Sequence, residues 1–256
     1  MASLTLDRIT KIYNKGVKAL DDVTIEVNDK EFFIVLGPSG SGKTTTIRIA
    51  AGLETPTSGK VFLDEKEITD YPPKDRDIAM VFQSYALYPF LNVRNNIAFP
   101  LKARKMNKKD IDAKVEEVAK LLQIEDLLDR KPEEISGGQR QRVALGRALV
   151  RDAKVYLMDE PLSNLDAKLR SSMRVELKNL QKRLEITVVY VTHDQLEALT
   201  LGDRLIVINH GKVIQEGKPE DVFNNPKTPF VAGFLGDPPM NFLKGTVNKD
   251  DPSEVI

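Results

Sequence analysis

A glycine-rich segment with a lysine is the clearest chemical feature of the chain. Residues 37–44 read GPSGSGKT, which fits the phosphate-loop pattern G-x-x-x-x-G-K-[ST]. Glycines let the backbone curl so that successive N–H groups face inward around an anion. We expect Lys43 to reach the β- and γ-phosphates of a nucleotide and Thr44 to ligate magnesium. The alternative, an ordinary turn with a chance lysine, does not account for an eight-residue match.

Acidic residues and a histidine follow two apolar runs. Asp159 and Glu160 come directly after Val155–Met158, and His193 follows Thr187–Thr192. In open α/β sheets, ligands bind at the carboxyl ends of the strands. Asp159 fits a magnesium-binding role and Glu160 a base that polarises water, while a solvated pair of acids is the other reading. His193 could hydrogen-bond the γ-phosphate, although lone histidines are more often structural. His210, in a predicted turn, is read as solvated.

A second anion site is suggested by SGGQR at residues 136–140. Ser136 is a plausible N-cap, and two glycines at a helix N-terminus could bind an anion. An ordinary helix start with a flexible entry explains the same residues, and the residue pattern alone leaves both possibilities open.

The elements that must position these residues alternate between strands and helices. Phe32–Leu36 is continuously apolar, as expected of a strand buried on both faces, and a helix over Lys43–Ala51 should point its positive N-terminal end at the phosphates. This alternation predicts an α/β fold with a mostly parallel, doubly wound sheet. Further strands are expected at Lys60–Leu63, Ile78–Phe82, Val155–Met158, Thr187–Thr192 and Leu205–Ile208, and Asn209–Lys212 should form a hairpin turn.

A helical block interrupts this rhythm between about residues 84 and 150. Asn107–Asp129 has helical apolar spacing with Asn107 as N-cap, which indicates an inserted helical subdomain. A charged amphipathic helix is expected over Ala167–Leu184. After Pro238-Pro239, residues 240–256 hold too few apolar side chains to fold alone.

Composition excludes several classes of protein. There is no cysteine, so disulfides and thiolate catalysis are impossible. Basic and acidic residues number 38 each, so the chain has no net positive charge that would attract nucleic acid. We therefore expect no nucleic-acid partner. No stretch approaches the roughly 20 apolar residues of a membrane helix, and the N-terminus does not read as a signal peptide.

Taken together, the motifs resemble those of ATP-binding-cassette (ABC) ATPases. Their order along the chain is Tyr13, GPSGSGKT, Gln83, ISGGQ, VYLMDE, SNLD and His193, and the match extends to about residue 235. There are two departures: Ile135 replaces the usual leucine before SGGQ, and Asn164 replaces the usual alanine of SALD. The second falls at a loop that makes a cross-subunit contact in the family.

The resemblance implies a phosphate-loop NTPase core with an antiparallel β subdomain and an inserted helical subdomain, and it assigns roles to residues. Tyr13 would stack on adenine, Glu160 would be the catalytic base, and His193 the γ-phosphate switch. Lys43 and Gln83 would complete the catalytic set, and Thr44, Gln83 and Asp159 would bind Mg²⁺. The residues that would contact ATP are Tyr13, Gly37, Pro38, Ser39, Gly40, Ser41, Gly42, Lys43, Thr44, Thr45 and Asp166 from one subunit, with Ser136, Gly137, Gly138 and Gln139 acting on the ATP of a second.

A narrower resemblance, to sugar-importer ATPases of the maltose and multiple-sugar type, comes from residues 82–101, 192–204 and 236–247. It implies a nucleotide-binding domain over 1–235, and a linker and the start of a truncated regulatory β-barrel domain over 236–256. The ATPase would dimerise with ATP, would bind permease subunits through residues 84–101 at the cytoplasmic face of the membrane, and would serve a solute-binding protein indirectly. Polyamine, iron, sulfate or glycerol-phosphate importers have similar ATPases. A soluble, non-transport ABC ATPase is a further alternative, although the chain lacks their usual second cassette or coiled-coil insertion.

Overall fold

The computed structural model describes residues 2–236 and 238–243. Its centre is a six-stranded sheet in which only the edge strand β10 is antiparallel to its neighbour. Its strands, in spatial order, are β10 (Lys212–Gly217), β9 (Arg204–Asn209), β3 (Phe32–Leu36), β8 (Thr187–Thr192), β7 (Val155–Asp159) and β6 (Ile78–Val81). This arrangement confirms the mostly parallel α/β sheet and the β9–β10 hairpin.

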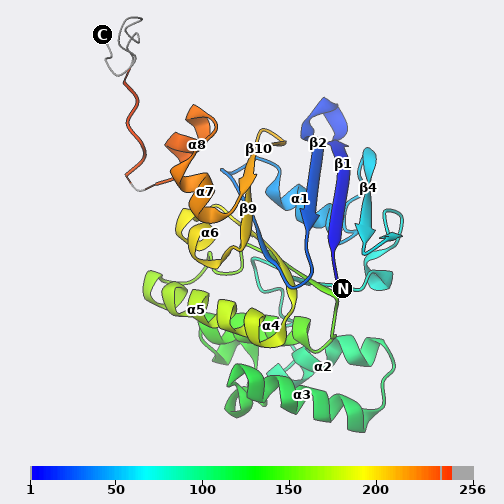
Figure 1. Cartoon of the computed structure of the whole chain (residues 1–256). Coiled ribbons are helices and arrows are strands. Elements are labelled where there is room, and N and C mark those ends of the chain that lie inside the picture. Colours follow the sequence, from blue (N-terminus) through cyan, green and yellow to red (C-terminus); the bar gives the residue numbers. More distant parts are fainter. Residues whose placement is uncertain (1, 237, 244–256) are drawn as a thin grey trace, which may run out of the picture.

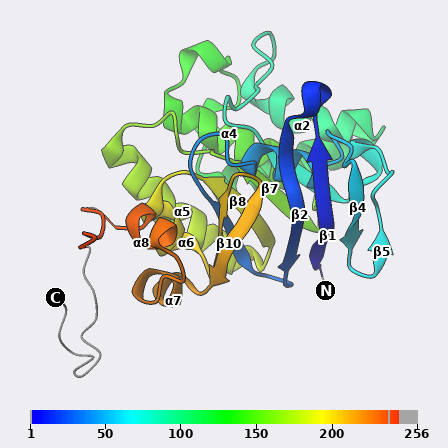
Figure 2. The ribbon, with the colours of Figure 1, turned by 90° about the horizontal axis from the view of Figure 1, so that it is seen from above.

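A second, antiparallel sheet packs beside the first (Figures 1 and 2). Its strands, in spatial order, are β2 (Lys18–Val27), β1 (Leu4–Ile12), β4 (Ser58–Leu63) and β5 (Lys66–Glu67). Arg8 in β1 and Asp22 in β2 have positive φ angles of 48° and 54°, and the β1–β2 register shifts between Leu6 and Ile9. These irregularities explain why the apolar alternation of the first strand is imperfect in the sequence.

Helices cover the central sheet unequally. The helix α1 packs between the two sheets, and the other helices lie on the opposite face, with α2 and α3 farthest from the antiparallel sheet in the view of Figure 1. The helices are α1 (Lys43–Ala50), α2 (Val93–Ala103), α3 (Lys108–Leu122), α4 (Gly137–Leu149), α5 (Ala167–Leu184), α6 (Gln195–Leu201), α7 (Pro219–Asn224) and α8 (Pro229–Phe234), with 3₁₀ turns at Asn14–Gly16, Pro73–Asp75, Glu125–Leu127 and Pro132–Glu134.

Strand β3 joins the two hydrophobic cores. Phe32, Ile34 and Leu36 pack into the core between the central sheet and the helices α2 to α8. Phe33 and Val35 pack into the other core, which includes α1 and the second sheet. All five side chains are fully buried, as the continuous apolar run predicted. The residue that follows β3 is therefore fixed from both faces of the sheet.

One expected helix is shorter than the sequence pattern suggests. The pattern predicted a helix over Asn107–Asp129, but α3 ends at Leu122, and Gln123 adopts a left-handed conformation with φ 56°. Glu125–Leu127 continues as a 3₁₀ turn. The expected N-cap is confirmed, because the Asn107 side chain accepts from the backbone N–H of Asp110 at 2.9 Å.

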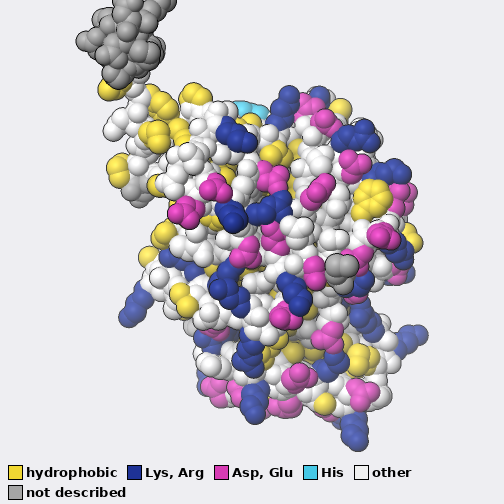
Figure 3. All heavy atoms as spheres, in the orientation of Figure 1, with side chains coloured by type: hydrophobic (Ala, Val, Ile, Leu, Met, Phe, Trp, Pro, Cys, Tyr) yellow, Lys and Arg dark blue, Asp and Glu magenta, His cyan; other side chains and the backbone are white. Residues whose placement is uncertain are grey.

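The domain limits stay predictions. Helices α2, α3 and α4 fall within residues 84–150, but the assignment of 1–235 as one domain is not tested by this structure. Most of the second segment, 236–256, lies outside the described residues. Lys and Arg side chains are interspersed with Asp and Glu over the face in Figure 3, in keeping with the neutral charge balance.

Candidate active site

The phosphate loop leaves β3 at Leu36 and enters α1 at Lys43. A Cβ atom on Gly37 would lie 2.2 Å from the carbonyl oxygen of Ile208, so no larger residue fits there. Gly42 has φ +109°, and a Cβ atom on it would lie 2.7 Å from the carbonyl oxygen of Ala19. Both glycines are therefore required by the close backbone packing that shapes the loop.

Lys43 lies folded back over this loop. Its Nζ donates to the carbonyl oxygen of Pro38 at 2.9 Å and is 3.9 Å from Oε1 of Glu160. Burial lowers the pKa of Lys43, and the negative charges of Glu160 and Asp159 oppose this shift. Within the described part of the chain, the buried Ser41 Oγ has no hydrogen-bond partner. A buried cation and an unsatisfied hydroxyl in one loop fit a phosphate group.

Oxygen ligands for a divalent cation meet beside the loop. Thr44, the second residue of α1, lies with its Oγ1 3.5 Å from Oδ1 of Asp159 at the end of β7. Burial raises the pKa of Asp159, and the charge of Glu160 raises it further. Because Mg²⁺ takes one or two carboxylates with hydroxyl and water oxygens, this pair fits a magnesium site.

Glu160 is the point where the polar side chains converge. Its Oε2 lies 2.9 Å from Nδ1 of His193 and 3.5 Å from Nε2 of Gln83. Its backbone is left-handed, with φ 43°, and its N–H donates to the carbonyl oxygen of Val191 on β8 at 3.0 Å. The sequence-predicted residues from the ends of β3, β6, β7 and β8 thus come together in one place. His210 is exposed in the β9–β10 turn, as expected.

The loop after Glu160 adds two residues that the sequence reasoning did not place in the site. Ser163 Oγ donates to the carbonyl oxygen of Glu160 at 2.8 Å and lies 3.3 Å from Nε2 of Gln83. Asn164 Nδ2 donates to the carbonyl oxygen of Gln83 at 2.8 Å. The departure at Asn164 therefore supplies a bond within the chain, and spacing along the sequence gives no signal for it.

Tyr13 lies near the start of α1. Its hydroxyl is 3.4 Å from Oγ1 of Thr45 and 3.4 Å from a carboxylate oxygen of Glu54. Its ring lies 5.0 Å from Nζ of Lys11. The half-buried ring is thus held at the side of the phosphate-binding helix, which is compatible with the adenine contact predicted for it.

The SGGQ turn does not join this cluster in the structure. Ser136 and Gln139 form a reciprocal capping box at the start of α4, which confirms Ser136 as the N-cap. No hydrogen bond or ion pair among the described residues connects the turn with the phosphate loop. Asp166, which the resemblance placed near ATP, caps α5 by accepting from the N–H of Leu169 at 2.9 Å.

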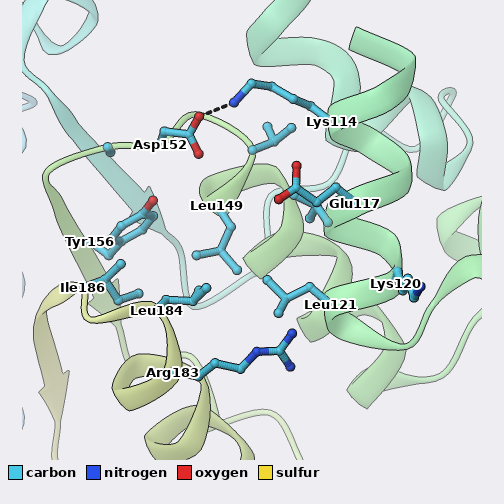
Figure 4. A pocket seen from close by; sticks show the side chains of 13 residues that line it. Lys114, Glu117, Lys120, Leu121, Leu149, Asp152, Tyr156, Arg183, Leu184 and Ile186 are labelled. Atoms are coloured by element: carbon cyan, nitrogen blue, oxygen red, sulfur yellow. Dashed lines mark hydrogen bonds and ion pairs between the residues drawn. The ribbon is translucent and has the colours of Figure 1, made fainter. Parts of the chain in front are cut away.

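A separate groove of about 680 Å³ lies between α3, the end of α5 and the start of β7. Its floor is apolar, formed by side chains such as Leu149, Tyr156 and Leu184, and Lys114 pairs with Asp152 at its edge (Figure 4). None of its lining residues belongs to the phosphate loop. It is therefore distinct from the candidate active site.

Comparison with known proteins agrees with this geometry. The family model "ABC transporter" matches residues 20–163. The trehalose/maltose import ATP-binding protein MalK of Thermococcus litoralis is 57% identical over 256 residues, covering 98% of this chain and 68% of that protein. The sn-glycerol-3-phosphate import ATP-binding protein UgpC of Bartonella quintana is 55% identical, with 95% and 70% covered. The dimeric post-hydrolysis structure of the ATP-binding cassette MJ0796 with ADP and Pi superposes with a TM-score of 0.75 at 34% identity, covering 84% and 98%.

These matches define the class of protein. The chain belongs to the ABC transporter family and is its ATP-binding cassette, an ATPase. In the described residues, no helix is both long and apolar enough to cross a membrane.

Proposed function

We propose that this chain is the ATP-hydrolysing subunit of an importer for sugars or oligosaccharides, working as a pair of identical cassettes. The observation that carries the proposal is the convergence of His193, Gln83 and Lys43 on the carboxylate of Glu160, directly beside the phosphate loop. Catalysis at such a site consists of positioning and of stabilising charge.

The contacts support a role for each residue. Loop N–H groups and Lys43 bind the phosphates, and Glu160 accepts a proton from the attacking water. Gln83 and His193 orient the Glu160 carboxylate, because both of their side chains meet the same oxygen. His193 would also hydrogen-bond the γ-phosphate of bound ATP. Thr44, Gln83 and Asp159 would hold Mg²⁺, which neutralises phosphate charge when bound. Tyr13 contacts the adenine.

The SGGQ turn acts on the nucleotide of a second copy. Its N–H groups lie at the N-terminal end of α4, a 13-residue helix whose dipole favours an anion. In the part of the chain that the structure describes, no hydrogen bond or ion pair joins Ser136–Gln139 to the phosphate loop of the same chain. A partner whose Ser136–Gln139 faces this loop would complete the site, with Asp166 near the same interface. The relative MJ0796 cassette was solved as a dimer, which supports pairing.

Transport would follow from closure of this pair. The 84–101 region, which begins directly after Gln83, would bind integral-membrane permease subunits at the cytoplasmic face of the membrane, with a solute-binding protein acting indirectly. The cargo is inferred from the relative named as a trehalose/maltose importer. Glycerol-phosphate import is the second candidate, because a relative of nearly equal identity carries that name.

Substitution of Glu160 tests the proposal. Glu160→Gln keeps the size of the side chain but cannot accept a proton, so turnover of Mg-ATP should fall by about 100- to 10,000-fold, while ATP binding stays within a few-fold. The matched control is Glu185→Gln, which changes an exposed glutamate paired with Lys30 on the surface. Normal turnover of Glu160→Gln in a steady-state phosphate-release assay would refute the assignment.

A further inference from the structure

A buried carboxylate lies next to the His193 loop without a role in the proposed chemistry. Glu197, in the first turn of α6, is 3% exposed. Its Oε2 accepts from the hydroxyl of Thr192 at 2.6 Å and from the hydroxyl of Tyr190 at 3.0 Å. No ion pair of Glu197 occurs among the described residues. Burying a carboxylate without a counter-ion is costly, so this arrangement requires an explanation.

The fold brings the three side chains together in a simple way. Tyr190 and Thr192 are two residues apart on β8, and side chains with that spacing point to the same face of a sheet. The helix α6 packs against this face. The charged groups that act on Glu197 are Asp194 on the same loop and Arg170 from α5, and burial raises the pKa of the Glu197 carboxyl.

Thr192 connects this carboxylate to the turn that carries His193. A hydroxyl group has one proton to donate, and Thr192 gives it to Glu197. Its lone pairs are therefore oriented to accept from the N–H of Asp194, at 2.9 Å. Asp194 is held further, because its Oδ1 accepts from the N–H of Glu197 at 3.1 Å. The backbone on both sides of His193 is thus tied to a buried anchor.

His193 itself has little else to fix it. Its side chain is 54% exposed, and its one recorded side-chain bond in the described structure is to Glu160. The place of the imidazole therefore depends on the backbone of residues 192–194. We propose that Thr192 and Glu197 are positioning residues that set the His193 ring against Glu160. This inference rests on the proposed role of His193 in hydrolysis.

Three variants separate positioning from stability. Thr192→Val keeps the shape but removes the hydroxyl, so kcat for ATP should fall about tenfold or more, since small misplacements at a site are costly, with KM changed less than about twofold. Thr192→Ser restores the hydroxyl and should restore kcat. Tyr190→Phe removes the other bond to the same carboxylate but leaves the turn intact, so it should retain kcat. An equal loss of kcat in Thr192→Val and Tyr190→Phe would overturn the inference.

NMR of the histidine side chains tests the position of His193 against Glu160 independently of ATP turnover. The chain has two histidines, so His210 is an internal reference for His193. In Thr192→Val the imidazole resonances of His193 should shift while those of His210 stay, and Tyr190→Phe should shift neither. Unchanged His193 resonances would contradict the inference. A shift with normal turnover would support the positioning role and refute the role of His193 in hydrolysis. Should Thr192→Val fail to fold, Glu197→Met, which removes the oxygen that accepts from Thr192, replaces it with the same expected shift.

Discussion

At the scale of single residues, Gln83, which follows β6, contacts the loop 160–164, which follows β7. The side chain of Gln83 lies near Glu160 and Ser163, and its main-chain carbonyl accepts from Asn164. Gln83 is exposed and ends the run from β6, so the loop 160–164 is what restrains it. Asn164 is thus placed to keep Gln83 near the base.

Asn164→Ala removes this bond. A hydrogen bond of this kind contributes about 0.5–1.5 kcal/mol to the free energy of unfolding, so stability should fall by no more than that amount. Because Gln83 is then less restrained beside Glu160, kcat should fall by about two- to tenfold. Asn179→Ala, an exposed asparagine on α5, is the control and should keep full turnover. If both variants hydrolyse ATP at the wild-type rate, the bond between Asn164 and Gln83 does not act in catalysis.

The sequence predicted some of these residues better than others. Lys43, Thr44 and Glu160 were proposed because phosphate chemistry restricts residue type and spacing, and the structure places Lys43 near Glu160 and Thr44 near Asp159. Glu197 was not, because it follows Asp194 by three residues, a spacing typical of an exposed capping box. In the structure its side chain instead turns inward to β8, a contact that depends on how α6 packs on the sheet.

At the scale of elements, α1 is fixed at both ends. Its N-terminus is the phosphate loop, and its C-terminus is capped by Arg76, whose guanidinium donates to the carbonyl oxygens of Ile49 and Ala50, both at 2.8 Å. Arg76 also bonds to the carbonyl oxygens of Tyr71 and Thr69, and it is 2% exposed. A cation at a helix C-terminus is favourable, so this residue anchors the helix that carries Lys43.

Arg76→Met should destabilise the protein because it leaves buried carbonyl groups without donors. We expect the free energy of unfolding to fall by about 2–4 kcal/mol, measured by urea denaturation. Arg48→Met, on the exposed face of α1, should change it by less than about 0.5 kcal/mol. Equal stability of the two variants would show that Arg76 does not anchor α1.

Element type followed from the apolar pattern, but element ends did not. Phe32–Leu36 was predicted correctly because both of its faces are buried. The end of α3 was missed because Ile124, Leu127 and Leu128 continue the apolar spacing and are buried, while the left-handed residue that stops the helix is Gln123. Because the residue at this helix end is not a glycine, the sequence does not mark the end. The apolar spacing alone therefore predicted a helix that is too long.

At the scale of the whole molecule, the surface between residues 84 and 101 is the candidate contact with permease subunits. Within the apolar run of this region, Tyr85 is buried and Leu87 packs against the core, whereas Phe90 is 74% exposed. Phe90 and Phe99 flank Tyr88, with ring centroids 6.1 and 4.5 Å from it. An exposed aromatic group of this kind is typical of an interface.

Phe90→Asp should weaken assembly with the permease subunits and leave ATP hydrolysis by the free cassette unchanged. Leu87→Asp is expected to do the same, but its contact with the core makes folding a second cause. Val175→Asp, an exposed apolar position on α5, is the control for added charge. Undiminished co-purification of Phe90→Asp with the permease subunits would exclude this surface.

The account depends most on a nucleotide bound between two copies, and cysteine cross-linking tests that directly. The chain has no cysteine, so Ser39→Cys in one copy and Ser136→Cys in another give a single possible mixed disulfide. With both chains also carrying Glu160→Gln, Mg-ATP should produce the 39–136 cross-link between chains, and ADP should not. An ATP-trapped dimer that never forms this cross-link, while the single-cysteine chains still bind ATP normally, would contradict the account.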